Sequence, residues 1–281
     1  MGPRVKVCNI PFGSKEPLID ILYEDEELLV VNKPAGLVCH PTKGDCLSSL
    51  IARVRIYLGC CPLRQGVKDC IYRSSGECPW DSVEFIDPLL SVNFINRLDR
   101  ETSGVMLITK TQEAARIYGK IMREGRMKKS YQAIVKGIPE PKAGLIERPL
   151  GADENSTVVV KDCVREDGYP SETVYRLVKS FERDGNVYSL LNVFPGTGRK
   201  HQIRIHLSWM GCPIVGDKLY GESPEYYLAF VENRLSEEQR QKLILPYHAL
   251  HAKSLSFTTF SGKEYYFECP PEKWFREFAM F

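Results

Sequence analysis

The 281-residue sequence predicts an α+β fold with a mixed or antiparallel sheet. Two patterns support this prediction: strand candidates outnumber helical ones, and most neighbouring strands are joined by short hairpin turns. Hydrophobic residues make up 43% of the chain, which is enough for a sizeable core. One elongated domain or two tightly joined halves would both fit this composition.

The N-terminal part of the chain predicts an arm followed by a folded domain. Residues 1–18 carry several prolines and glycines and predict an irregular arm, so we place the domain at residues 19–281. Two short strands, 19–23 and 28–32, are expected on either side of an acidic turn.

A helix and an insertion are expected next. The apolar spacing within residues 47–58 predicts a helix, with Asp45 as its cap. Residues 59–91 contain scattered cysteines, prolines and glycines, so we interpret them as a Cys-containing insertion loop.

The rest of the chain mixes strands with fewer helices. Strands are predicted at 105–108, 131–135, 157–160, 173–181, 186–194, 255–260 and 264–268. Helices are predicted at 111–124, 199–210 and 273–278, with a further charged helical segment at 224–245 outside the core. The turn at 183–186 predicts a hairpin between two of the strands.

The most informative stretch surrounds Asp99. Arg97 and Arg100 flank this carboxylate, a small polar turn follows, and then comes the buried strand at 105–108. Cationic neighbours lower the pKa of a carboxyl group, so Asp99 is expected to be ionised. The tripeptide Arg-Leu-Asp alone is far more typical of a surface ion pair, so the interpretation depends on the context given by the residues around it.

That context consists of blocks that resemble the RluA family of pseudouridine synthases. The Asp99 block runs from residue 97 to Lys110 and contains Arg-Leu-Asp and Thr-Ser-Gly. The others, in the family's order, are 30–41 (beginning Val-Val-Asn-Lys-Pro-Ala-Gly-Leu), 129–137 (Lys-Ser-Tyr-Gln-Ala-Ile-Val-Lys-Gly), 198–221 (beginning Gly-Arg-Lys-His-Gln-Ile-Arg-Ile-His-Leu) and 250–257. The resemblance covers most of residues 19–268.

This resemblance implies the pseudouridine synthase fold, a curved central sheet with flanking helices and a central cleft. It also implies an isomerase that converts specific uridines of structured RNA, rRNA or tRNA, into pseudouridine by base flipping, without metal or organic cofactor. Asp99 is then the nucleophile, Tyr131 stacks on the flipped base and takes the proton from C5, and Arg204 pairs with the nucleophile. Arg97 resembles the residue that enters the RNA stack. The alternative for Tyr131 is a core tyrosine, and the alternatives for Arg204 are a phosphate contact and an arginine on the helix surface.

The chemistry explains why a carboxylate is needed. The reaction breaks the N1–C1′ bond of uridine and rejoins the base through C5. An ionised carboxylate can capture an electron-poor sugar carbon, as in retaining glycoside hydrolysis. Attack at C1′, attack at C6 and assistance to elimination remain open for Asp99. Flipping costs a few kcal/mol, and a planar guanidinium such as that of Arg97 can replace the lost base in the stack.

The chain departs from the family pattern in three places: at Asn96, in the lack of an S4 module before the first block, and at residues 59–91, which are longer and richer in cysteine than usual and leave the choice of target RNA open. Asn96 stands where many members have His, which leaves the nucleophile unchanged but alters how its loop is held. Glu101 has no chemical role in the pattern, so we expect it to be structural or solvent-exposed. No RNA-binding S4 module is expected before the first block.

Charge is informative only locally. The net charge is +2, yet residues 120–131 hold five basic residues against one acid, and residues 185–216 contain no carboxylate. Two basic segments predict one phosphate-binding face, although a solvated face balanced by acids elsewhere has the same composition. The residues expected to bind RNA are Arg97, Lys128, Lys129, Arg199, Lys200 and His201.

The chain has ten cysteines, no signal peptide and no apolar run of 18 residues. We therefore expect a cytoplasmic monomer with free thiols and no membrane span. The cysteines lack Cys-x2-Cys spacing, so no zinc site is expected. His201, His206, His248 and His251 are assigned to structure or RNA contacts.

Two other functions compete with the isomerase. A non-catalytic RNA-binding protein of the same fold is disfavoured because Asp99, Tyr131 and Arg204 are all present. A glycoside hydrolase is disfavoured because no second carboxylate has a motif context.

Overall fold

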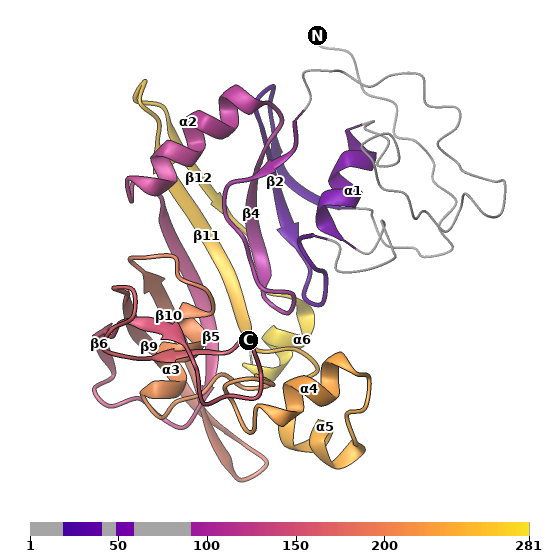
Figure 1. Ribbon diagram of the computed structural model, residues 1–281, viewed down its shortest axis with the longest axis vertical. Coiled ribbons are helices and arrows are strands. Elements are labelled where there is room, and N and C mark those ends of the chain that lie inside the picture. The colour runs from indigo at the N-terminus through magenta and orange to yellow at the C-terminus, as the bar shows by residue number, and fades with distance from the viewer. Residues whose placement is uncertain (1–18, 41–48, 59–90, 281) are drawn as a thin grey trace, which may run out of the picture. The chain divides into compact units, whose positions relative to one another are not determined.

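The computed structural model describes residues 19–40, 49–58 and 91–280 (Figure 1). It contains two compact units. The first comprises Met1–Lys33, Leu37–Arg100 and Met106–Lys120, and the second comprises Pro34–Gly36, Glu101–Val105 and Ile121–Phe281. The predicted arm at 1–18 and the insertion loop, apart from Ser91, lie outside the described residues, as does Asp45.

The first unit is built on short strands with an apolar core. β1 (Asp20–Glu24) pairs antiparallel with β2 (Leu28–Lys33), and β3 (Asn93–Phe94) pairs antiparallel with β4 (Ser103–Thr109). The four apolar residues that open β2 are all 0% exposed, as expected for a strand covered on both faces. Helix α1 (Leu50–Tyr57) and most of helix α2 (Gln112–Arg123) also belong to this unit.

The second unit is organised around a mixed sheet. Hydrogen bonds link its strands in the order β4-β11-β5-β10-β9-β6, and β12 also pairs with β11. The pair β4–β11 is parallel and the other pairs are antiparallel. The bounds are β5 (Lys128–Lys136), β6 (Ala143–Glu147), β9 (Glu172–Arg183), β10 (Asn186–Pro195), β11 (Leu250–Thr258) and β12 (Glu264–Glu268).

Gly104 allows β4 and β11 to approach closely. Its φ is +114°, and a Cβ at this position would lie 2.2 Å from the carbonyl oxygen of Ala252. Only a residue without a side chain fits there, because both the dihedral and the space exclude Cβ. The polar turn after Asp99 therefore leads directly into the parallel pair of the sheet.

Five helices and a small second sheet complete the described fold. The helices are α2 (Gln112–Arg123), α3 (Gln202–Trp209), α4 (Glu225–Val231), α5 (Glu237–Leu243) and α6 (Lys273–Phe278). The small sheet pairs β7 (Leu150–Ala152) with β8 (Asp162–Val164). Helix α3 packs against β8, β9 and β10, which places its buried side chains on the sheet. None of the helices in the described part is long and apolar enough to span a membrane.

These elements confirm the α+β class, the mixed sheet and most of the predicted strands. The strand predicted at 157–160 is wrong: the segment forms turns between β7 and β8, and Val159 is 94% exposed. The β-branched residues suggested a strand, but hydrogen bonds of the turn, such as Lys161 N to Val158 O, override that preference. Residues 224–245 form two helices rather than one, because Ser236 starts α5 with a capping box. Strands β3, β6, β7 and β8 were not anticipated.

Candidate active site

The loop that carries Asp99 is fastened to the following strand by Asn96. Asn96 is buried, and its Oδ1 accepts a hydrogen bond of 2.7 Å from the backbone N–H of Leu107 in β4. The N–H of Ile95 donates to the carbonyl of the same leucine at 2.9 Å. The residue that departs from the family pattern thus holds the loop directly.

A buried lysine of the first motif holds the other end of this loop. Lys33 is 0% exposed, and its Nζ donates to the carbonyls of Leu37 (2.9 Å) and Arg100 (3.0 Å). The Cys39 thiol lies 3.2 Å from the carbonyl of Leu98. Backbone atoms on both sides of Asp99 are therefore tied to residues 33–39. The sequence marked this block as a motif but gave Lys33 no role.

Asp99 is half-buried, whereas Arg97 and Arg100 are exposed. Burial and the positive charge of Arg97 together lower the pKa of His40, so this imidazole stays neutral near physiological pH. Exposure of Arg97 is compatible with the predicted insertion into an RNA stack, which stays a prediction.

Tyr131 lies near the start of β5 in the second unit. It is 9% exposed and is flanked in the sheet by Val193 of β10 and Ala252 of β11. Strands on both sides fix its backbone, so its side chain is presented from a rigid element. Its role on a flipped base stays a prediction.

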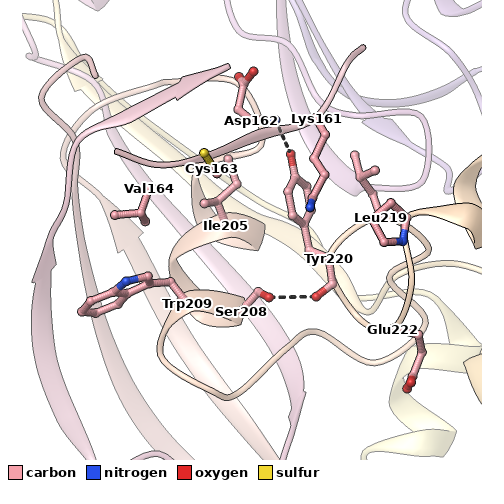
Figure 2. Close-up of a pocket in the computed structure, with 11 residues that line it drawn as sticks. Lys161, Asp162, Cys163, Val164, Ile205, Ser208, Trp209, Leu219, Tyr220 and Glu222 are labelled. Atoms are coloured by element: carbon pink, nitrogen blue, oxygen red, sulfur yellow. Dashed lines mark hydrogen bonds between the residues drawn. The ribbon is translucent and has the colours of Figure 1, made fainter. Parts of the chain in front are cut away.

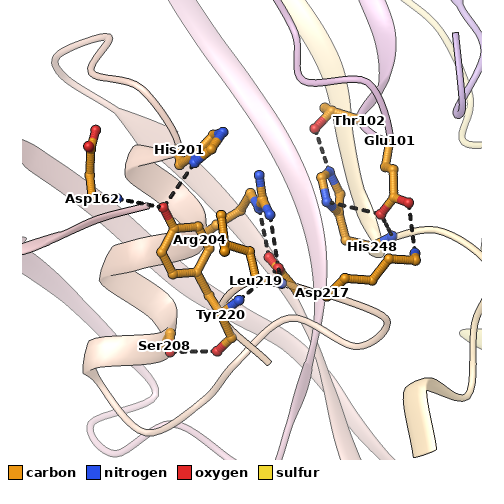
Figure 3. A network of polar contacts seen from close by, with 11 residues as sticks. Glu101, Thr102, Asp162, His201, Arg204, Ser208, Asp217, Leu219, Tyr220 and His248 are labelled. Carbon is orange, nitrogen blue, oxygen red and sulfur yellow. Dashed lines mark hydrogen bonds and ion pairs between the residues drawn. The ribbon is translucent and has the colours of Figure 1, made fainter. Parts of the chain in front are cut away.

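Arg204 is held by a buried carboxylate that sequence reasoning did not single out. Its Nε and Nη2 donate to Asp217 at 2.7 and 2.9 Å, a bidentate arrangement that fixes the guanidinium plane (Figure 3). Asp217 Oδ1 also accepts from the N–H groups of Leu219 and Tyr220. Burial acts to raise the pKa of Asp217, but the Arg204 charge and these hydrogen bonds outweigh it and hold the pKa well below its usual value.

Tyr220 connects this ion pair to the helix start. The Arg204 guanidinium lies 5.0 Å from the centre of the Tyr220 ring, and the Tyr220 hydroxyl lies 2.9 Å from Nδ1 of His201. The same hydroxyl accepts from the N–H of Asp162 at 3.2 Å. Burial raises the pKa of Tyr220 strongly, so the phenol remains protonated. His201 is thus half-buried and structurally engaged.

A second ion pair lies beside the first. Glu101 is 7% exposed and binds Nζ of Lys218 at 2.7 Å, so it is structural and the solvent-exposed alternative is wrong. The N–H of His248 donates to its other oxygen at 3.3 Å, and Nε2 of His248 lies 2.7 Å from the Thr102 hydroxyl. Burial raises the pKa of Glu101, which the Lys218 charge opposes.

The predicted RNA-binding residues differ in exposure. Lys128, Arg199 and Lys200 are exposed, and Lys200 pairs with Asp162 at 2.9 Å. Lys129 is half-buried: its Nζ donates to the carbonyl of Thr197 at 3.1 Å, and burial lowers its pKa. RNA contact stays a prediction for all of them, and Lys129 has a structural task in addition.

Gln202 shapes the glycine-rich loop before α3. Its Oε1 accepts from the Thr197 hydroxyl (2.7 Å) and the Arg199 N–H (3.0 Å), and its Nε2 donates to the carbonyl of Glu172 (2.7 Å). This buried amide fixes the loop that carries the predicted basic residues. A glutamine at the start of a helix is a weak sequence signal, which is why it was missed.

The buried histidines have structural partners. His251 lies 2.9 Å from the Ser103 hydroxyl and 3.0 Å from the carbonyl of Cys269, and burial lowers its pKa to about 4. His206 similarly bridges Thr173 and the carbonyl of Arg148. Within residues 19–40, 49–58 and 91–280, no three His, Cys, Asp or Glu side chains are grouped to hold a metal ion.

A pocket of about 330 Å³ lies beside α3 and shares Asp162, Leu219 and Tyr220 with the polar network described above (Figure 2). Ile205, Ser208 and Trp209 line it from the helix, and β8 with the segment before it contributes Lys161 to Val164. Its walls carry both lysine and acidic side chains. This mixture indicates no single class of ligand.

Comparison with known proteins agrees with the geometry. Residues 27–209 match the family described as RNA pseudouridylate synthase. The dual-specificity RNA pseudouridine synthase RluA of Salmonella typhimurium is 34% identical over 75% of this chain and 80% of its own length. RNA pseudouridine synthase 2, chloroplastic, of Arabidopsis thaliana is 29% identical over 90% of this chain but only 62% of its own length. The chain likewise spans 58% of a relative from Aquifex aeolicus.

A solved structure shows the same fold. Human RNA pseudouridylate synthase domain containing 1 superposes with a TM-score of 0.65 and 22% identity, over 94% of this chain and 88% of that one. Taken with the family match and the Salmonella relative, the chain belongs to the RluA family of RNA pseudouridine synthases.

Proposed function

We propose that this protein isomerises uridine to pseudouridine in structured RNA, rRNA or tRNA, with Asp99 as nucleophile. The observation that carries the proposal is the loop around Asp99: within the segment that matches the family, Asn96 binds β4, and Lys33 and Cys39 bind backbone carbonyls around Asp99. A catalytic carboxylate needs a fixed geometry, because small misplacements lower the rate steeply. The contacts of Asn96, Lys33 and Cys39 give the Asp99 loop such a fixed geometry.

Arg204 and Tyr131 complete the proposed chemistry. Asp217 keeps the guanidinium of Arg204 oriented, so this cation is ready to stabilise an ionised carboxylate. Tyr131, held between two strands, stacks on the flipped base and accepts the C5 proton. Attack of Asp99 at C1′, attack at C6 and assistance to elimination all require the ionised form of Asp99.

The RNA is held through phosphate contacts and an inserted side chain. Exposed Lys128, Arg199 and Lys200 are the proposed phosphate contacts, and Arg97 takes the place of the flipped uracil in the stack. Neisserial relatives are named ribosomal large subunit pseudouridine synthase D, which makes rRNA the first substrate to test. We also propose that the protein acts in the cytoplasm as a monomer, without metal or organic cofactor.

Tritium release tests this function. Purified protein is incubated with rRNA and tRNA pools labelled with tritium at C5 of uridine, because forming the C5–C1′ bond expels that tritium. Release into water, with pseudouridine recovered from the digested RNA, is the expected result. Binding without release would identify a non-catalytic RNA-binding protein, and free uracil would identify a glycoside hydrolase; either would refute the proposal. Activity is expected to survive EDTA and dialysis.

A further inference from the structure

The chain immediately after Asp99 is held by a series of basic side chains. Within the second unit, Glu101, Thr102 and Ser103 each contact a different basic residue: Lys218 (2.7 Å), His248 (2.7 Å) and His251 (2.9 Å). Of these three contacts, only the first joins two ionisable side chains of opposite charge. The Glu101–Lys218 pair is therefore the strongest restraint at this point.

Lys218 is fixed in turn by its own surroundings. It is 4% exposed, its Nζ also donates to the carbonyl of Pro246 at 2.8 Å, and it lies 4.8 Å from the centre of the Phe230 ring. One carbonyl acceptor and an aromatic face orient the ammonium before Glu101 is considered. Glu101 accordingly binds a preformed site rather than a flexible side chain.

The residue before Lys218 is the carboxylate that orients Arg204. Asp217 and Lys218 follow Gly216, whose φ is +80° and whose Cβ would lie 2.4 Å from the carbonyl of Tyr247. Two consecutive residues of this turn therefore bind different parts of the unit. Asp217 binds Arg204 of α3, and Lys218 binds Glu101 in the segment after Asp99. Figure 3 shows Asp217 directed at Arg204, and Glu101 and His248 as a neighbouring group.

We propose that the Glu101–Lys218 ion pair is a positioning device for the nucleophile, anchoring the C-terminal end of the Asp99 loop to the turn that orients Arg204. Glu101 follows Asp99 by two residues, and two residues span at most about 7 Å, so an anchor at Glu101 restrains the Asp99 backbone. Neither Glu101 nor Lys218 touches substrate in this scheme. The inference rests on the proposed function for its effect on turnover, but not for its effect on the loop.

The test uses Glu101→Leu/Lys218→Met, which removes both charges together and leaves neither buried alone. Amide hydrogen exchange of the RNA-free protein is followed in peptides that cover residues 97–103, with β5 peptides as an internal reference. We expect exchange in the loop to rise at least about tenfold while β5 is unchanged. We expect kcat for tritium release to fall about 100-fold with RNA Kd within a factor of about three, since misplacement of a catalytic group costs that much.

A matched control is the exposed pair on α5, Glu238→Gln/Lys242→Met, whose members lie 2.8 Å apart. It should leave both loop exchange and kcat unchanged. Glu101→Gln keeps an acceptor for Lys218 and should recover part of the protection and of the turnover. If the double variant folds with wild-type loop exchange and kcat, the pair has no positioning role and the inference fails. If wild-type protein releases no tritium, the proposed function fails, while loop exchange still decides the anchor.

Discussion

Two buried lysines, one in each unit, hold consecutive residues of the chain after Asp99. In the first unit Lys33 donates to the carbonyl of Arg100 at 3.0 Å, and in the second Lys218 donates to the side chain of Glu101 at 2.7 Å. Both lysines are almost completely buried, at 0% and 4% exposure. They differ in the acceptor: Lys33 also binds the Leu37 carbonyl, whereas Lys218 binds a carboxylate.

The two lysines therefore contribute to stability in different ways. The two carbonyls bound by Lys33 are dipoles that do not titrate, so their contribution is the satisfaction of buried backbone groups. Lys218 neutralises a buried charge, and its removal leaves a carboxylate that must either stay ionised at high cost or take up a proton. The described acceptors of Lys33 are neutral, whereas the stability contributed by Lys218 depends on the ionisation of Glu101 and therefore on pH.

Lys218→Met should produce the largest effect and expose this dependence. Breaking a buried ion pair costs about 3–5 kcal/mol of unfolding free energy near pH 8. Without Lys218 the pKa of Glu101 rises further above its unfolded value, so the deficit is small where Glu101 is protonated and grows as pH rises through that pKa. Urea denaturation at pH 5 and pH 8 measures it. Equal deficits at both pH values would show that Glu101 does not depend on the lysine charge.

His251 differs from both lysines because it is a buried basic group that is neutral in the folded protein. Its pKa is about 4 in the fold against 6.5 ordinarily, because it is buried. Between pH 6.5 and 4 the imidazole is protonated in the unfolded chain but neutral in the folded one. Stability that is present above pH 6.5 is therefore lost as the pH falls towards 4. We expect His251 to account for a loss of up to about 3 kcal/mol over this window. His251→Asn should flatten that part of the stability profile; an unchanged profile would contradict the assignment.

A test of Arg204 must not leave its partner Asp217 as an unpaired buried charge. Arg204→Met alone would leave the 0%-exposed Asp217 side chain buried without its cation, so a lost activity would be ambiguous. Arg204→Met/Asp217→Asn avoids this. If Arg204 also serves Asp99, turnover should fall about 10- to 100-fold, more than affinity, and the acidic limb of the pH–rate profile should move to higher pH. Arg204→Lys should recover part of the rate. A proportional loss of affinity with an unchanged pH profile would make Arg204 a phosphate contact.

The smallest effects are expected at the adjacent residues Lys128 and Lys129, which differ in exposure. Lys128 is exposed, whereas Lys129 binds the Thr197 carbonyl at 3.1 Å. Lys128→Ala should reduce the slope of log K against log salt by about 0.7–0.9, the value of one phosphate contact. Lys129→Ala should change the slope less and lower Tm, because it releases the loop before α3. Equal slope changes for both variants would place both lysines on RNA.

Much of the fold was predictable from local patterns. The strands at 28–32 and 186–194 combine β-branched and apolar residues, and the turn between β9 and β10 places Asp184 and Gly185 at positive φ, as its sequence indicates. The strand prediction at 157–160 was wrong because the valines there have a high strand propensity, whereas the backbone hydrogen bonds of the segment close a turn. Propensity describes one residue at a time, and the turn depends on partners on both sides.

The motif residues were predictable as a set, but their supports were not. Lys33, Asp217 and Lys218 stand inside matched blocks, yet nothing in the sequence says that they are buried or which groups they bind. Glu101 was expected to be structural or exposed, and only the fold shows its cation, 117 positions away in the chain. Long-range polar pairs leave no periodic signal, which is why the anchors of the site emerge from the structure alone.

Asp99 is the proposed nucleophile of an RNA pseudouridine synthase, and the substitution Asp99→Asn examines this role. The change removes the negative charge and hardly alters volume, so fold and RNA affinity should be preserved. Tritium release from C5-labelled RNA should fall to background, while filter binding gives a Kd close to that of the wild type. An Asn variant that still turns over at a substantial fraction of the wild-type rate would contradict the claim.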